Sequence, residues 1–233
     1  MTALQEFAQN IWIVEGPLVW DMGLEFPTRM AIVKLSDGSV WVSSPVPASF
    51  ETLKNITELG PVRYLIAATP RHVWRLDSWH TLYPEAQLWM ARPTAVTLKK
   101  ADLPVTGFLD DTPPEAWAGD MEQLIFRGNP LLSEVLFYHR QARTVLLDDL
   151  IQSNPPLDGR AFRNAVFKAA GGLAPQAGVG RDMRLTFFDR KLARQSLEKL
   201  LSWDFDKLII AHGACVETDA KQYIKKAFTW LEK

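Results

Sequence analysis

The segment over residues 62–68 constrains the fold of this chain more than any other stretch. It is mostly apolar and too short for a typical helix, so it predicts a buried β-strand. Pro70 then ends regular strand pairing, because proline has no backbone N–H to donate. His72 follows at once, and loops at the C-terminal ends of strands carry the functional side chains in α/β sheets. His72 is therefore the first candidate for a functional residue.

The rest of the first half predicts antiparallel strands followed by alternating helices and strands. Strand-like runs lie at residues 10–15, 29–35, 39–44 and 86–90, with an Asp-Gly turn between the second and the third. Apolar residues at helical spacing predict a helix over residues 47–60, which Gly60 ends, and a helical turn over residues 76–83. This half is expected to pass from a hairpin into helix–strand units.

The second half repeats the progression from sheet to helix. Strands are predicted over residues 123–127, 133–139, 143–147 and 207–211, and helices over residues 160–170, from about residue 189, and over residues 220–231. Residues 92–120 are expected to form a loop with a short helix near 94–100, and residues 177–184 a flexible basic loop. Two sheets flanked by helices predict an α/β fold with four layers, α, β, β and α, as a single domain over residues 1–233.

Charge and cysteine content narrow the functional classes. The 26 basic and 27 acidic side chains give a formal charge of −1, so neither nucleic acid nor a membrane is an expected partner. No apolar run is long enough for a membrane helix, and the first residues lack a signal-peptide pattern. Cys215 is the only cysteine, so an internal disulfide is excluded. These features predict a cytoplasmic location and leave the oligomeric state open.

Three predicted strands end in residues that can bind a metal. His72 follows the strand at 62–68, Asp149 follows the strand at 143–147, and His212 follows the strand at 207–211. Histidine nitrogens and carboxylate oxygens are ligands of zinc and of non-haem iron. If the three strand ends lie at one edge of the fold, these side chains meet in one cleft.

The order of these strand ends resembles the metallo-β-lactamase-like fold, in a branch known as a domain of unknown function. The resemblance covers nearly the whole chain and rests on four motifs, which are Ala67-Ala-Thr-Pro-Arg-His, Tyr83-Pro-Glu-Ala, residues 134–150 and Ala211-His-Gly. It implies an αββα sandwich of two mixed or antiparallel sheets whose loops gather a metal site. The branch itself implies a fold and no activity.

The chain departs from the metal-binding pattern of that superfamily. Of the motif Thr-His-x-His-x-Asp-His, only the second histidine is present, as His72, and Asn129 stands near the place of a further histidine. Asp149 matches the bridging aspartate and His212 the last histidine. The resemblance therefore implies at most one zinc or iron ion, held by His72, Asp149 and His212, rather than a two-metal centre. The alternative is a site without metal, where the three side chains hydrogen-bond one another.

Three functions follow from these alternatives. The first is a degenerate metallo-hydrolase of unknown substrate, in which Asp149 binds the ion and also shares proton transfer. The second is a non-catalytic protein that uses the old cleft to bind a small anion or a partner protein. The third is a mononuclear iron oxidoreductase, because two histidines and one carboxylate form a facial triad. His139, at the end of a predicted strand, is a reserve ligand.

Basic and aromatic side chains predict an anion-binding mouth beside His72. Arg71, Trp74 and Arg75 flank the histidine, and Arg181 lies in the predicted basic loop. Guanidinium groups bind carboxylates or phosphates through paired N–H donors, so the predicted ligand is a small anionic molecule. The alternative is that these arginines form ion pairs with Asp77, Asp148 or Asp182.

Overall fold

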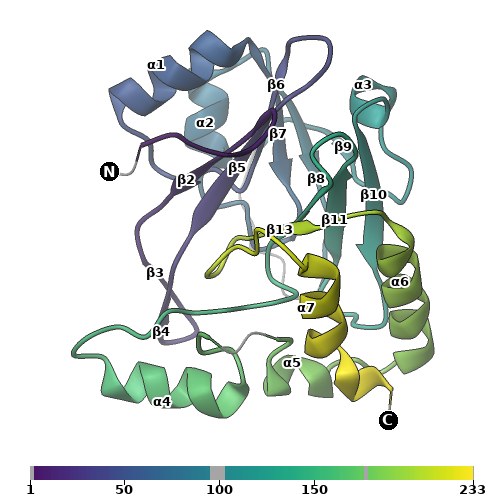
Figure 1. Ribbon diagram of the computed structural model, residues 1–233. Helices are drawn as coiled ribbons and strands as arrows, with labels where there is room; N and C mark the ends of the chain where they lie inside the picture. The colour runs from purple at the N-terminus through teal and green to yellow at the C-terminus, as the bar shows by residue number, and fades with distance from the viewer. Residues whose placement is uncertain (1–2, 95–102, 176–177, 233) are drawn as a thin grey trace.

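The computed structural model describes residues 3–94, 103–175 and 178–232. Two β-sheets pack face to face at the centre, and helices cover their outer faces (Figure 1). The four layers predicted from the sequence are thus present.

The first sheet has seven strands and changes from antiparallel to parallel at β6. In spatial order they are β1 (Gln5–Ala8), β2 (Ile11–Glu15), β5 (Arg29–Lys34), β6 (Val40–Ser43), β7 (Val62–Ala67), β8 (Gln87–Met90) and β9 (Val105–Phe108). The strands from β1 to β6 pair antiparallel, whereas β6, β7, β8 and β9 pair parallel. The parallel part carries β7 with its C-terminal end at the loop of His72.

The second sheet has four strands, and a separate hairpin lies beside the two sheets. The sheet contains β10 (Met121–Phe126), β11 (Glu134–His139), β12 (Thr144–Leu147) and β13 (Lys207–Ile210), of which only β12 and β13 pair parallel. The hairpin consists of β3 (Val19–Asp21) and β4 (Leu24–Phe26).

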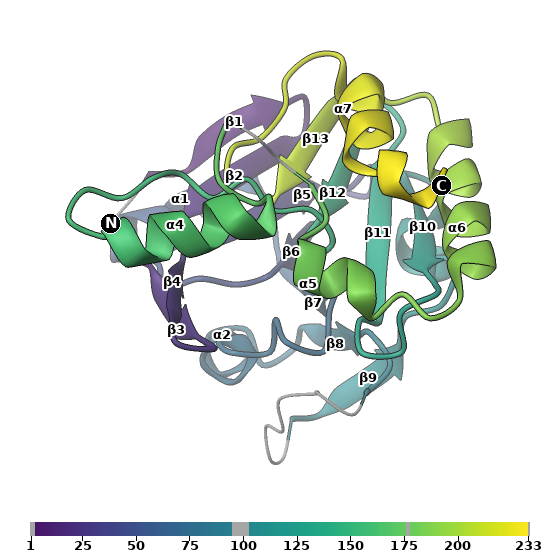
Figure 2. The ribbon, with the colours of Figure 1, turned by 90° about the horizontal axis from the view of Figure 1, so that it is seen from below.

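Helices cover both sheets and the lower end of the molecule. The first sheet packs against α1 (Phe50–Leu59) and α2 (Leu76–Leu82), and the second against α6 (Arg190–Ser202) and α7 (Ala220–Ala227), which a 3-10 turn follows at Thr229–Leu231. Short α3 (Glu115–Ala118) precedes β10. Seen from below, α4 (Ala161–Ala170) and α5 (Arg181–Leu185) lie in front of the sheets (Figure 2).

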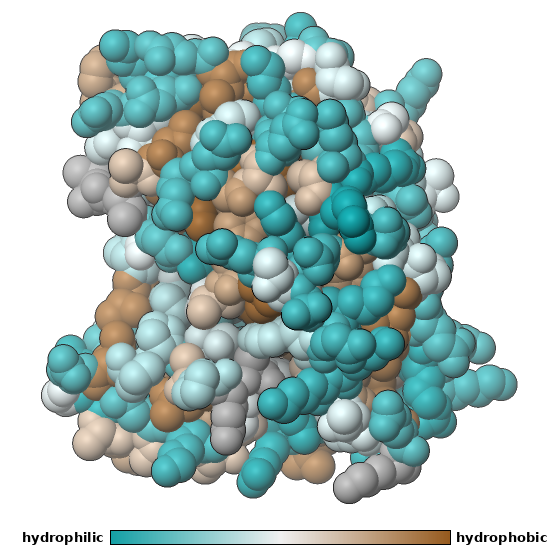
Figure 3. All heavy atoms as spheres, viewed as in Figure 1, coloured by the Kyte–Doolittle hydropathy of each residue, from teal (hydrophilic) through white to brown (hydrophobic). Residues whose placement is uncertain are grey.

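Three apolar layers hold the sandwich together. The central layer joins the inner faces of the two sheets, with Trp41 and Ile66 on one side and Phe137 and Ile209 on the other. Each outer layer joins one sheet to its own helices. The face seen in Figure 3 is largely polar, with apolar side chains exposed in separate places. Burial of the inner faces is therefore what fixes the two sheets relative to each other.

Most predicted elements are present, and several assignments were wrong. The expected loop over residues 92–120 contains β9 and α3, and its predicted helix near 94–100 falls largely outside the described residues. The expected basic loop over residues 177–184 runs into the short helix α5. Strands β1, β3 and β4 were not predicted. These elements are short and partly exposed, so pairing and packing, rather than a local apolar pattern, define them.

No helix among the described residues combines the length and the apolar character that crossing a membrane requires.

His139 is structural in this fold and gives a test of stability against pH. His139 is the last residue of β11, and its side chain is buried. Its Nδ1 accepts the Ala142 N–H at 3.1 Å. Burial lowers the pKa of His139 below its usual value, although Asp120 opposes this shift. The unfolded chain therefore takes up a proton more readily than the folded one, and stability falls as the pH drops through the unfolded value of about 6.5.

We expect His139→Asn, which keeps an acceptor near the Nδ1 position, to reduce this loss. Urea unfolding of wild type and variant at about pH 7.5 and about pH 5.5 measures it. The free energy of unfolding should fall less on acidification in the variant. An equal fall in both proteins would show that His139 does not contribute.

Candidate metal centre

The ends of three strands meet at one edge of the sandwich. Strands β12 and β13 pair in parallel with Leu147 opposite Ile210, so the residues that follow them leave the sheet side by side. The third strand, β7, belongs to the other sheet, and the Val135 N–H donates to the Ala68 carbonyl at 2.9 Å where the two sheets touch. This arrangement places His72, Asp149 and His212 together.

The three side chains form a triangle of nitrogen and oxygen atoms. Nε2 of His72 lies 3.1 Å from Nε2 of His212 and 3.4 Å from Oδ1 of Asp149. Nε2 of His212 lies 3.1 Å from the same Oδ1 atom. The side chains of His72, Asp149 and His212 are only 11%, 10% and 9% exposed, so water reaches these atoms poorly.

Hydrogen bonds on the far side of each imidazole aim its Nε2 into the triangle. Nδ1 of His212 lies 2.7 Å from the Pro27 carbonyl oxygen, which can only accept, so Nδ1 carries the proton. Nδ1 of His72 lies 2.7 Å from Oγ of Ser44 and 3.1 Å from Oδ2 of Asp148. The Ser44 hydroxyl also bonds that Oδ2 atom at 2.6 Å, so a proton on Nδ1 of His72 completes the chain of bonds. In the neutral form both Nε2 atoms are then acceptors.

A tight turn holds the loop of His72 against Asp149. The His72 N–H donates to the Thr69 carbonyl at 3.2 Å, and Pro70 sits at the second position of this turn, where its fixed φ is favourable. The Thr69 hydroxyl donates to Oδ2 of Asp149 at 2.8 Å. Only Oδ1 of this carboxylate therefore faces the two imidazoles.

The charges of the site are strongly coupled. Burial opposes the charged forms, yet the carboxylates of Asp148 and Asp149 raise the pKa of His72 well above its usual value. Conversely, His72 and His212 hold the pKa of Asp149 well below its usual range despite burial. Both shifts favour positive charge where the three side chains converge, which is where a metal ion would lie.

The donor set fits a metal ion by geometry and by chemistry. Ligands about 2.0–2.1 Å from a tetrahedral zinc ion lie roughly 3.3 Å from one another, close to the three separations found. Two imidazoles and a carboxylate suit zinc and iron alike. In the described part of the chain, no other group of three or more His, Cys, Asp or Glu side chains could hold an ion in this way.

Several residues that shape the site were not found from the sequence. Glu134 accepts backbone N–H bonds from the loop of Asp149, while Ser44, Asp148 and the Pro27 carbonyl orient the two histidines. Burial, followed by the charges of Asp149 and Asp148, raises the pKa of Glu134 well above its usual value. A glutamate at the start of a mostly apolar strand was the signal that could have pointed to it.

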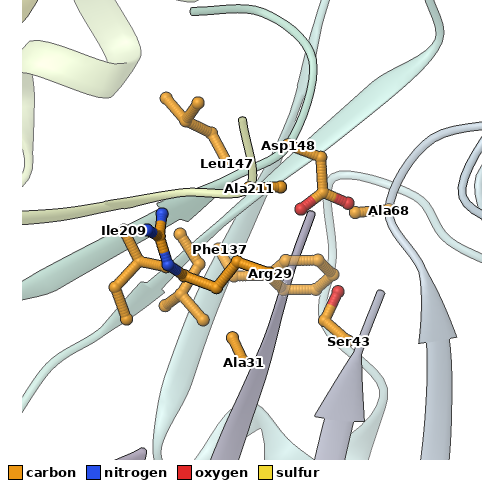
Figure 4. Close-up of a pocket in the computed structure, with 10 residues that line it drawn as sticks. Arg29, Ala31, Ser43, Ala68, Phe137, Leu147, Asp148, Ile209 and Ala211 are labelled. Atoms are coloured by element: carbon orange, nitrogen blue, oxygen red, sulfur yellow. The ribbon is translucent and has the colours of Figure 1, made fainter. Parts of the chain in front are cut away.

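The cavity between the two sheets behind the site is small. A cavity of about 10 Å³ lies between the sheets, lined by Arg29, Ser43 and Asp148 together with apolar side chains (Figure 4). It has room for about one water molecule, whereas ligand pockets measure several hundred Å³. This cavity is therefore too small to hold a substrate.

The structure places the predicted anion-binding residues on two elements. Arg71 forms an ion pair with Asp21 of β3, which links the loop of His72 to the β3–β4 hairpin. Trp74 and Arg75 are exposed on the same loop, and Arg181 is exposed at the start of α5. Arg71 thus has a partner, but not one of the three aspartates considered from the sequence.

Comparisons with known proteins identify the fold. A family model described as "Domain of unknown function (DUF4336)" matches residues 8–157, and no curated protein sequence matches the chain. The metallo-beta-lactamase from Pontibacter korlensis is 11% identical with a TM-score of 0.59, over 100% of both chains.

Two further solved structures agree. The metallo beta lactamase from Hirschia baltica is 12% identical with a TM-score of 0.59, over 95% of this chain and 97% of the other. The metal-soaked Flv1 flavodiiron core from Synechocystis sp. PCC6803 is 13% identical with a TM-score of 0.63, over 99% of this chain and 61% of the other. The metallo-β-lactamase-like fold predicted from the sequence is confirmed.

Gly213, directly after His212, provides a test of how tightly this loop is built. Its φ is +130°, and an added Cβ would overlap the backbone carbonyl of Ser153. We expect Gly213→Ala to lower the free energy of unfolding by about 2–4 kcal/mol. Gly119→Ala is the control, because a Cβ there meets nothing within 4 Å, and its effect should stay within about 0.5 kcal/mol. Equal effects in chemical denaturation would contradict this account.

Proposed function

The chain belongs to the DUF4336 family, and from this premise we propose that it binds one metal ion through His72, Asp149 and His212 as a metallo-hydrolase-like protein. The observation that supports this most is the triangle of two Nε2 atoms and one carboxylate oxygen, with separations of 3.1–3.4 Å. Without a cation or a proton, three acceptors would face one another in a buried site. The whole of residues 1–233 is proposed to act as one domain around it.

Each of the three ligands has a partner that fixes its orientation. The Pro27 carbonyl holds His212, Asp148 and Ser44 hold His72, and the Thr69 hydroxyl holds Asp149. Such outer contacts set the tautomer and direction of ligands in metal sites. A zinc ion held in this way would act as a Lewis acid and would lower the pKa of a bound water molecule to about 7.

We assign Asp149 chiefly to metal binding. Its lowered pKa keeps the carboxylate charged, which favours binding of a cation. The same low pKa makes Asp149 a weak base for taking a proton from a water molecule. Proton transfer by Asp149, the catalytic role predicted from the sequence, is therefore proposed as secondary.

The surroundings favour one ion over two. Where the superfamily pattern has further ligands, this chain has Pro70, Trp74 and Arg75. Asn129 is also engaged elsewhere, because its Nδ2 donates to Thr186 at 2.7 Å and its Oδ1 accepts the Leu131 N–H at 2.9 Å. At these positions of the described chain, no side chain remains that could hold a second ion.

The substrate is proposed to be a small anionic molecule. Trp74 and Arg75 are exposed beside His72, and Arg71 could exchange its partner Asp21 for a substrate carboxylate or phosphate. Arg181 on α5 remains a predicted further contact.

A mononuclear iron oxidoreductase is the second candidate. Two histidines and one carboxylate form the donor set that non-haem iron enzymes use. The likeness to a structure named as a flavodiiron core makes iron worth measuring beside zinc.

Metal content tests the proposal. Untagged protein, purified without chelator, should contain about one equivalent of zinc or iron by elemental analysis, and zinc affinity can be measured by equilibrium dialysis. His212→Ala and Asp149→Asn should each weaken binding by at least about 100-fold, because each removes a ligand from a set of three. His80→Ala is the control, since His80 lies on α2 outside the triangle, and it should bind like wild type.

The outcomes separate the candidates. Zinc lost in both ligand variants supports the hydrolase-like protein, and iron lost in both supports the oxidoreductase. Absence of metal from wild type, with no binding on dialysis, would overturn the proposal in favour of a non-catalytic binding protein. Metal retained in His212→Ala would show that the ion lies elsewhere.

A further inference from the structure

A buried glutamate accepts hydrogen bonds from the loop that carries Asp149. Oε1 of Glu134 accepts the Asp148 N–H at 2.7 Å, and its Oε2 accepts the N–H groups of Asp149 and Leu150 at 3.0 and 2.6 Å. The Glu134 side chain is fully buried at the start of β11. Both oxygens are thus used on three consecutive backbone amides.

Three successive amides that point to one centre form a typical anion-binding nest. In many proteins such a nest binds a free phosphate or another anion, whereas here a side chain of the neighbouring strand occupies it. Burial strongly disfavours a carboxyl group without hydrogen-bond partners, and these three bonds pair both of its oxygens. The nest in turn cannot move without leaving Glu134 unpaired.

Holding these amides determines where two adjacent carboxylates point. Asp148 turns its Oδ2 toward Ser44 and Nδ1 of His72, while Asp149 turns its Oδ1 toward the Nε2 atoms of both histidines. A small rotation of this backbone would move both oxygens at once. The proposed ligand Asp149 and the partner of His72, Asp148, therefore depend on the same three hydrogen bonds.

We infer that Glu134 is a positioning residue, which fixes Asp149 as a ligand and Asp148 as the partner of His72 through the backbone of residues 148–150. The inference rests on the proposed metal site, and it predicts an effect on geometry that is present without metal as well. Glu134 contacts neither the ion nor a substrate in this role.

Glu134→Gln tests the inference with little change of shape. The amide keeps one acceptor oxygen but presents N–H donors to backbone N–H groups, so at least one bond of the three is lost. We expect the dissociation constant for zinc to rise about 10- to 100-fold, as for other outer-contact residues of metal sites. Glu122→Gln is the matched control, because Glu122 bonds Arg140 and Trp203 near the opposite end of the sheet, and its zinc affinity should equal that of wild type.

Amide hydrogen exchange of the metal-free proteins gives a second readout. Exchange at residues 148–150 should become at least about tenfold faster in Glu134→Gln and stay unchanged in Glu122→Gln. If Glu134→Gln does not fold, Glu134→Asp, which keeps the carboxyl group on a shorter side chain, is measured in the same way.

The two readouts separate this inference from the proposed function. Unchanged exchange at residues 148–150, or faster exchange with unchanged zinc affinity, would overturn the positioning role. If wild type binds no metal, the proposed function fails, and the exchange result alone decides whether Glu134 holds the loop.

Discussion

Parallel pairing of β12 with β13 is the interaction on which the site depends. The register that sets Leu147 opposite Ile210 makes the two strands end together, so Asp149 and His212 become neighbours although 63 residues separate them. The hydrogen bond from Val135 to Ala68 then fixes the end of β7 against the same edge. With these two contacts in place, His72 needs only a tight turn to reach the other two side chains.

Burial makes charged carboxylates at this edge of the sandwich energetically costly. Asp148, Asp149 and Glu134 are all buried, and an unpaired carboxylate there would cost several kcal/mol. Hydrogen bonds from Ser44, Thr69 and three backbone amides offset part of that cost. Positive charge on His72 is favoured by the same carboxylates, which raise the pKa of this histidine. Charge balance and the metal hypothesis thus come from the same set of atoms.

The sequence predicted the parts of the site that depend on local patterns. An apolar strand followed by a polar residue is visible in one chain segment, so His72, Asp149 and His212 could be chosen before the structure was known. Glu134 could not, because its partners lie 14 to 16 residues away and meet it only through the pairing of β11 with β12. The role of the Pro27 carbonyl could not be predicted for the same reason, since 185 residues separate it from His212. Short β9 and α5 were missed because tertiary contacts define them.

Two residues at positions where the superfamily pattern has ligands, Pro70 and Asn129, have structural roles of their own. Pro70 stands where the superfamily has a histidine, and it favours the turn in which the His72 N–H bonds the Thr69 carbonyl. Asn129 bonds Thr186 and Leu131, so its amide belongs to the loop between β10 and β11. Pro70 and Asn129 thus hold the loops that lie around the His72, Asp149 and His212 side chains, and the proposed site depends on these loops for its geometry.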